Sequence, residues 1–263
     1  MFDITPIHAF SDNFIWLINE PDAGRGAVVD PGDAGPVLRM LDERGLDLVA
    51  IVITHGHADH VGGIRRLLER YPGIPVYGPR NEAIPGKTHP LGEGDEISIP
   101  DLDATFGIMD IPGHTGGHIA YFDGRPERPV LFCGDTLFSV GCGRVFTGTH
   151  DQLHDSLMRI ADLPPDTFAY CAHEYTLDNI GFARWVEPEN PALKHWEQRC
   201  HTRLDQGGDT VPSLLETERA ANPFLRIRER AVIEAVERHA GRAMRDSHDT
   251  FHTLRHWKDS EYD

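Results

Sequence analysis

The hydrophobic pattern of the first third of the chain alternates between short apolar runs and amphipathic stretches. Apolar runs over 14–18 and 26–30 predict two strands, and Leu48 to Ile53 predicts a fully buried one. Between them, apolar residues at helical spacing predict a helix over 34–44 that ends before Gly45. The alternation of strand, helix and strand predicts an α/β fold.

The middle of the chain has a strand-rich pattern, with short β-branched and aromatic runs separated by turns. A helix is expected over about 151–161 behind a capping box at Thr149–Gln152, and another strand over 168–171. The strands expected before that helix are 74–77, 96–99, 104–108, 119–122 and 130–133.

After His173 the pattern predicts helices and no further strand. Asn190 is an N-cap before a first-turn proline, Ser213 opens a second capping box, and residues 228–239 have a helical period that ends at Gly241. We therefore expect a first domain over 1–173 and a small all-α domain over 174–263.

Composition and charge narrow the class of protein. The chain has 263 residues, of which 40% are hydrophobic, so it can bury a core. Its formal charge of −17 disfavours nucleic acid and membrane partners, and an anionic small substrate needs basic residues gathered at its site. The amino terminus has no signal-peptide pattern, so we expect a cytoplasmic protein. We also expect a monomer. The four cysteines are too scattered for a disulfide framework and are expected to be buried and reduced.

The candidate chemistry begins in the loop Thr54–His60, which directly follows the buried strand over 48–53. In extended backbone His55 and His57 point the same way, whereas Asp59 and His60 fall at the start of a helix expected over 61–70. The loop can therefore offer two imidazoles to one metal ion, and a carboxylate with an imidazole to another. The alternative is a polar loop that is merely rich in histidine.

Three later segments place a ligand-type residue just beyond a strand. Strand ends at one edge of a sheet can converge, so these residues can join the loop at one site. His118 competes with His114, and His114 is preferred. The expected ligands are His55, His57 and His114 for one ion, Asp59, His60 and His173 for a second, and Asp135 as a bridge.

Seven ligands exceed the needs of one tetrahedral ion and suit two ions that share a carboxylate. We expect two divalent ions per chain. Zinc is the first expectation for such a set of histidines and carboxylates, with iron and manganese as alternatives.

These motifs resemble those of the metallo-β-lactamase superfamily. The resemblance covers essentially the whole chain and narrows to the glyoxalase II (hydroxyacylglutathione hydrolase) family. It implies a four-layer αββα metal domain followed by a helical domain that holds glutathione. The narrowing depends on the segments Gly141–Phe146, Ala172–Thr176, Asn222–Arg226 and Arg255–Asp259.

The resemblance implies a thioester hydrolase. Its reaction is the second step of methylglyoxal detoxification, in which a metal-bridging hydroxide cleaves S-D-lactoylglutathione to D-lactate and glutathione. Asp59 and Asp135 are the implied catalytic carboxylates, and Asp59 also orients the hydroxide. The implied substrate-binding residues are Arg144, Phe146, Tyr175, Arg255 and Lys258.

Three of these implied substrate-binding residues leave open questions. Phe146 stands where some relatives have tyrosine, which removes one hydroxyl contact. Arg255 and Lys258 lie three residues apart on a helix and so share one face, from which both can bind a carboxylate of glutathione. The alternative is that Arg255 and Lys258 are solvated charges on a terminal helix.

Two rival functions stay open at this point. A mononuclear-iron glutathione persulfide dioxygenase would use His55, His57, His114 and Asp135, but the resemblance gives that family no helical C-terminal domain. A non-catalytic metal-binding protein on the same fold would keep the ligands without the reaction. Metal content and thioester hydrolysis, each measured before and after chelation, distinguish the three.

Overall fold

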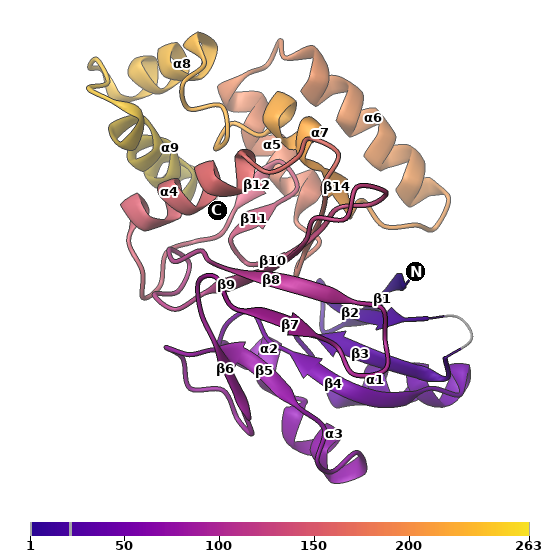
Figure 1. Cartoon of the computed structure of the whole chain (residues 1–263). Coiled ribbons are helices and arrows are strands. Elements are labelled where there is room, and N and C mark those ends of the chain that lie inside the picture. Colours follow the sequence, from indigo (N-terminus) through magenta and orange to yellow (C-terminus); the bar gives the residue numbers. More distant parts are fainter. Residues whose placement is uncertain (1, 21–22, 263) are drawn as a thin grey trace. The chain divides into compact units, whose positions relative to one another are not determined.

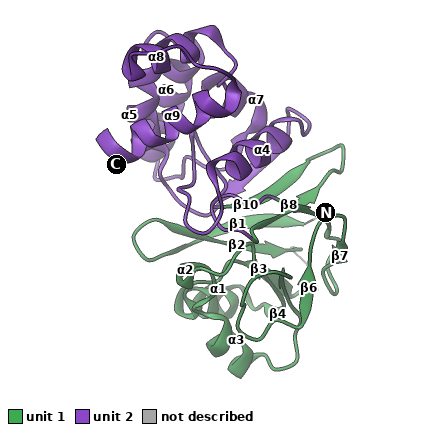
Figure 2. Cartoon of the chain, turned by 90° about the vertical axis from the view of Figure 1, so that its left-hand side faces the viewer, with its two compact units in different colours: residues 1–110, 117–134 green, residues 111–116, 135–263 purple. Residues whose placement is uncertain are grey.

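The computed structural model describes residues 2–20 and 23–262 (Figure 1). The chain divides into two compact units, coloured separately in Figure 2. The first unit comprises Met1–Asp110 and Gly117–Gly134, and the second comprises Ile111–Gly116 and Asp135–Asp263. The domain boundary that we place at residue 173 stays a prediction.

The first unit contains a mixed sheet with the strand order β1-β2-β3-β4-β5-β6. Strands β1 to β3 pair antiparallel, and β3 to β6 pair parallel. Strand β4, which precedes the loop Thr54–His60, therefore lies between two parallel neighbours. The strands are β1 (Asp3–Ala9), β2 (Asn13–Asn19), β3 (Arg25–Val29), β4 (Asp47–Val52), β5 (Val76–Pro79) and β6 (His89–Leu91).

Helix α1 (Ala34–Arg44) packs on this sheet and has the bounds expected from the sequence. The carboxylate of Asp33 accepts a hydrogen bond from the Gly35 amide, and Gly45 ends the helix with φ of 63°, a value that glycine adopts without strain. Val37 and Leu41 share a buried core with sheet residues that include Ile15, Leu17, Val28 and Ile51.

The single helix expected over 61–70 is wrong: two helices, α2 (Ala58–Val61) and α3 (Ile64–Arg70), occupy this stretch. The break lies at Gly62 and Gly63, whose backbone approaches the β3–α1 loop closely. The Gly63 amide donates to the carbonyl of Pro31 at 2.9 Å, and a Cβ on either glycine would strike backbone there. Asp59 and His60 do lie in the first turn of a helix, as expected.

A second antiparallel sheet in the first unit contains β7 (Glu96–Ser98), β8 (Thr105–Asp110), β9 (Ile119–Asp123) and β10 (Val130–Gly134). The hydroxyl of Tyr121 on β9 donates to the carbonyl of Ile53 at 2.8 Å, which ties this sheet to the end of β4. The predicted strands here are confirmed within about two residues, the usual uncertainty of a boundary.

The second unit is mainly helical and carries two expected caps. Thr149 and Gln152 form the predicted capping box of α4, with bonds of 3.0 and 3.1 Å, and Asn190 caps α6 ahead of Pro191. Its helices are α4 (His150–Ala161), α5 (Thr176–Val186), α6 (Pro191–Asp205), α7 (Leu215–Ala221), α8 (Arg230–Ala240) and α9 (Ser247–Glu261). Its strands are β11 (Leu137–Phe138), β12 (Gly141–Cys142), β13 (Phe168–Cys171) and β14 (Ser213–Leu214).

The capping box expected at Ser213 is wrong, and so is the absence of strands after His173. Ser213 lies in β14 and pairs with Ala169 of β13, so its backbone belongs to a ladder. Helix α7 begins behind Leu214, which makes no side-chain cap. The α/β class with a mainly helical C-terminal stretch is nevertheless confirmed.

The four cysteines are buried and free, as expected. Among the described residues, none of the helices combines the length and the apolar character that crossing a bilayer requires.

Candidate metal centre

The loop after β4 brings its own ligand-type side chains together. The ring of His55 is fully buried, and its centroid lies 4.7 Å from that of His57 and 4.0 Å from that of His60. Nε2 of His60 lies 3.5 Å from Oδ2 of Asp59. Three imidazoles and one carboxylate are thus neighbours within one loop of the first unit.

Two residues that sequence reasoning missed orient this loop. Oδ2 of Asp30 lies 3.1 Å from Nδ1 of His60, and the Asp30 carboxylate accepts bonds of 2.8 and 2.7 Å from the amide and hydroxyl of Thr54. Asn13 donates from Nδ2 to Oδ2 of Asp59 at 3.0 Å. Partners of this kind fix the tautomer and direction of metal ligands.

A sequence signal for Asp30 did exist. Asp30 follows β3 directly, and β3 is the parallel neighbour of β4, so their carboxyl ends share one sheet edge. Taken alone, Asp30-Pro31-Gly32 indicates only the end of a strand. Asn13, at the start of a strand, offered no comparable signal.

In the second unit Asp135 faces two histidines. Its Oδ2 lies 3.4 Å from Nε2 of His114, and its Oδ1 lies 3.5 Å from Nε2 of His173. Nδ1 of His114 lies 2.8 Å from the carbonyl oxygen of Arg144, which favours a proton on Nδ1 and leaves Nε2 as the ligand atom. Because its two oxygens face different imidazoles, this carboxylate is oriented as a ligand that bridges two metal ions would be.

Only glycine fits at position 143, where the backbone passes close to Asp135 and His114. A Cβ at this position would meet the carbonyl of Asp135 and come within 3.1 Å of Nδ1 of His114. The Gly-Cys-Gly segment therefore lets the backbone pass under both ligand candidates.

His118 is placed differently from His114. It lies in the first unit, fully buried, with its ring stacked on that of His55 at a centroid distance of 4.7 Å. Packing accounts for its burial, which supports His114 as the candidate ligand.

The substrate-binding candidates all lie in the second unit. Phe146 is 63% exposed and meets the His114 ring edge-on at 5.2 Å, and the partly exposed Tyr175 ring stacks on His173 at 4.9 Å. Arg144 is exposed. The aromatic candidates therefore contact ligand candidates directly.

Arg255 and Lys258 are not the solvated charges considered as an alternative. Arg255 is 0% exposed; its Nη1 donates to the carbonyl of Cys142 at 3.2 Å and its Nη2 to Asp259 at 2.7 Å. Lys258 is also buried, with Nζ 3.9 Å from a carboxylate oxygen of Asp178. Asp259 and Asp178 lie beside the pair and reduce its net charge.

The donor chemistry of these residues fits a divalent transition metal. Imidazole nitrogens and carboxylate oxygens together suit zinc, iron and manganese. Nδ1 of His55 lies 3.2 Å from the Thr54 hydroxyl and Nδ1 of His114 lies 2.8 Å from the Arg144 carbonyl, which leaves Nε2 of each ring to bind a metal ion.

Comparisons with known proteins agree with this chemistry. Residues 10–173 match the metallo-β-lactamase superfamily, and residues 174–261 match the family described as hydroxyacylglutathione hydrolase C-terminus. The chain is 47% identical over 260 residues to the hydroxyacylglutathione hydrolase of Nitrosomonas eutropha, covering 99% of each chain. It is 49% identical over 267 residues to that of Cupriavidus taiwanensis, again covering 99% of each.

Solved structures share the fold at lower identity. ETHE1 from Myxococcus xanthus superposes with a TM-score of 0.65 at 23% identity, covering 100% of this chain and 93% of that one. TTHA1623, solved in a di-iron-bound form, has a TM-score of 0.52 at 28% identity and covers 65% of this chain and 91% of its own. The first of these shows only a shared metallo-β-lactamase fold. The near full-length identity to the curated relatives shows that this chain belongs to the hydroxyacylglutathione hydrolase family of the metallo-β-lactamase superfamily.

Proposed function

We propose that this chain hydrolyses the thioester of S-D-lactoylglutathione, and of related 2-hydroxyacylglutathiones, to the hydroxy acid and glutathione. The observation that carries the proposal is the Asp135 carboxylate, whose two oxygens face Nε2 of His114 and Nε2 of His173. Family membership adds the substrate class, because the relatives at 47–49% identity are named hydroxyacylglutathione hydrolases.

We assign the metal ligands as the sequence suggested. His55, His57 and His114 bind one ion, Asp59, His60 and His173 bind the second, and Asp135 binds both. When bound, two such ions supply an ionised water at neutral pH and positive charge that stabilises the developing oxyanion. Zinc is the first candidate, with iron and manganese as alternatives.

The residues of the chain would then position the reactants. Asp59, held by Asn13, accepts a hydrogen bond from the attacking water and aims it at the thioester carbonyl. The leaving group is a thiolate, which is stable in water, so it needs little help from a general acid. The chain offers Asp59 and Asp135 as its catalytic carboxylates, and no covalent intermediate on a side chain is required.

Binding of the glutathione arm falls to the cations and aromatics of the second unit. Arg144, Arg255 and Lys258 supply local positive charge in a chain whose formal charge is −17. Tyr175 and Phe146 border the ligand candidates His173 and His114. The monomeric state and the cytoplasmic location stay predictions.

The test combines metal analysis with thioester hydrolysis. We expect two metal ions per chain, and we expect chelation to remove metal and hydrolysis together, with both restored by added metal. Asp135→Asn should abolish hydrolysis, whereas Asp166→Asn, an exposed carboxylate in the same unit, should not affect it. One tightly held iron with oxygen uptake on glutathione persulfide would instead assign the chain to the dioxygenases. Bound metal without either activity would make it a non-catalytic metal-binding protein.

A further inference from the structure

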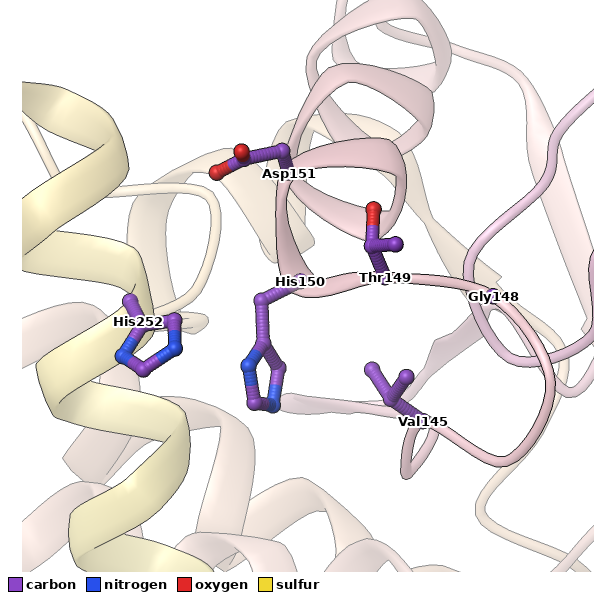
Figure 3. Close-up of a pocket in the computed structure, with 6 residues that line it drawn as sticks. All are labelled: Val145, Gly148, Thr149, His150, Asp151 and His252. Carbon is purple, nitrogen blue, oxygen red and sulfur yellow. The ribbon is translucent and has the colours of Figure 1, made fainter.

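Helix α4 of the second unit carries two histidines one turn apart, and α9 carries three, of which His248 and His252 contact the histidines of α4. His150 and His154 lie on α4, and His248 and His252 lie on α9. Residues four apart share one helix face, so each helix presents two imidazoles on one side. Figure 3 shows the side chains of His150 and His252 in the space between the two helices; their ring centroids are 4.4 Å apart. They line a cavity of about 290 Å³ together with Asp151 and neighbouring residues.

The other pair converges on one carboxylate oxygen. Nδ1 of His154 lies 2.7 Å, and Nε2 of His248 lies 3.0 Å, from the same Oδ1 of Asp155. The two ring centroids are 3.9 Å apart. One ligand atom from each of the three side chains lies within 4.8 Å of the others, so the three are close enough to share a single ion after a small adjustment.

His154 is held rigidly in this cluster. It is 2% exposed, and its ring packs edge-on against Phe251 of α9 at a centroid distance of 5.7 Å. Among residues 2–20 and 23–262, its Nε2 has no hydrogen-bond partner, so polar contacts fix this ring only through Nδ1. Nδ1, the ring nitrogen beside Asp155, is therefore the one positioned to act as a ligand.

We propose that His154, Asp155 and His248 form a further metal site, separate from the seven ligand candidates, that takes a divalent ion of the zinc class. Two imidazoles and one carboxylate are a ligand set that zinc accepts with a water in the fourth position. Ligands bonded at 2.0–2.1 Å in tetrahedral geometry lie about 3.3 Å apart, so these three must spread by a few tenths of an ångström. Asp155 and His248 have side chains 64% and 43% exposed, which leaves them room to do so.

The bound ion would link α4 to α9. Asp155 and His154 come from one helix and His248 from the other, so an ion shared by all three would hold the two helices together.

The experiment counts zinc on the purified, tag-free, metal-loaded chain after equilibrium dialysis against a zinc buffer. We expect His248→Asn to bind one zinc ion fewer per chain than the parent at the same free zinc concentration. His256→Asn is the matched control, since His256 is an exposed histidine on the same helix, and it should bind as many ions as the parent. Equal zinc content in the parent and His248→Asn would overturn the proposal.

Two further readouts separate this site from the catalytic one. His248→Asn should hydrolyse thioester at the parent rate, and a proportional loss of hydrolysis with the ion would assign that ion to the catalytic centre and refute the proposal. Added zinc should raise the melting temperature of the parent and of His256→Asn by more than that of His248→Asn, because only the first two keep the link between α4 and α9. Equal shifts in all three would contradict the proposed link.

Discussion

Nδ1 of His60 lies 3.1 Å from Oδ2 of Asp30, and both side chains are buried. The Asp30 carboxylate cannot easily turn away, because the amide and the hydroxyl of Thr54 both donate to it. A carboxylate behind an imidazole favours a proton on the near nitrogen and raises the basicity of the far one. His60 is thereby prepared to bind a metal ion through Nε2.

Asp30→Asn should weaken metal binding at the His60 side of the centre. The variant keeps the shape of the side chain and removes its charge, so His60 loses the partner that fixes its tautomer. Loss of such a partner typically costs about 10–100-fold in metal affinity or activity. Competition with a chelator measures the affinity, and thioester hydrolysis measures the activity. Asp47→Asn, at an exposed position on β4, is the control and should change neither; equal losses in both variants would contradict the role of Asp30.

A second prediction concerns an ion pair of the second unit in which the arginine, Arg255, is buried. Arg255 donates to Asp259 one turn further along α9 and to the carbonyl of Cys142. Arg255→Ala would remove this donor from the carbonyl of the buried Cys142, and a buried polar group left unsatisfied costs about 1–3 kcal/mol. We expect an unfolding free energy lower by about that amount, measured by denaturant titration. If glutathione binding also uses Arg255, KM should rise more than kcat falls.

Arg230 and Glu234 provide a matched comparison for Arg255. They also form an arginine–carboxylate pair four residues apart, at 2.6 Å, but the Arg230 side chain is 91% exposed. Solvent screens such pairs, so Arg230→Ala should leave the unfolding free energy and KM almost unchanged. A loss as large as that of Arg255→Ala would show that burial is not what makes the Arg255 pair important.

The sequence predicts elements whose signals are local. The helix predicted over 34–44 matches α1 to the residue because its apolar period ends at a glycine, Gly45. Strand β1 was missed because Pro6 interrupts it; the proline is tolerated since, in the described part of the sheet, β1 is an edge strand. The break between α2 and α3 was missed because it depends on contact with Pro31, more than thirty residues earlier in the chain.

The same distinction holds for the candidate site. His55, His57, Asp59 and His60 stand in one short motif, so their joint role is visible without a structure. Asn13 contacts Asp59 across a separation of 46 residues, and nothing in its immediate neighbours marks it. Asn13 is therefore found only through packing, whereas the four ligand candidates of the loop are found through their spacing.

A third prediction concerns the dependence of stability on pH. Glu218 is fully buried, and this burial raises the pKa of its carboxyl group, although hydrogen bonds from Ser213, the Val140 amide and Asn222 partly oppose the rise. Above the ordinary glutamate pKa of about 4.3, the unfolded chain loses this proton while the folded chain keeps it. Stability from this group therefore falls as pH rises from about 4 toward the raised pKa, by at most about 1.4 kcal/mol per pH unit.

Glu218→Gln should remove this contribution. The neutral amide can still accept from the Val140 amide through its oxygen, but it does not titrate. The unfolding free energy of the variant relative to the parent should rise with pH above about 4 and then level off once the parent carboxyl has ionised. Denaturant midpoints measured at a series of pH values test this, and a difference independent of pH would show that Glu218 has an ordinary pKa.

The last prediction concerns the hydroxyl that Phe146 lacks. Phe146 is 63% exposed, and its backbone amide donates to the carbonyl of His114 at 2.9 Å, so the ring is anchored beside a ligand candidate while its far edge meets solvent. Phe146→Tyr should add one hydrogen bond to the peptide arm of glutathione. A neutral hydrogen bond contributes about 0.5–1.5 kcal/mol, so KM should fall by roughly 2–12-fold while kcat stays unchanged. A thioester of a short thiol without the peptide arm is the control, since the new hydroxyl has nothing to bind there. An equal improvement on both thioesters would place the effect of residue 146 at the acyl group or at His114 rather than at the glutathione arm.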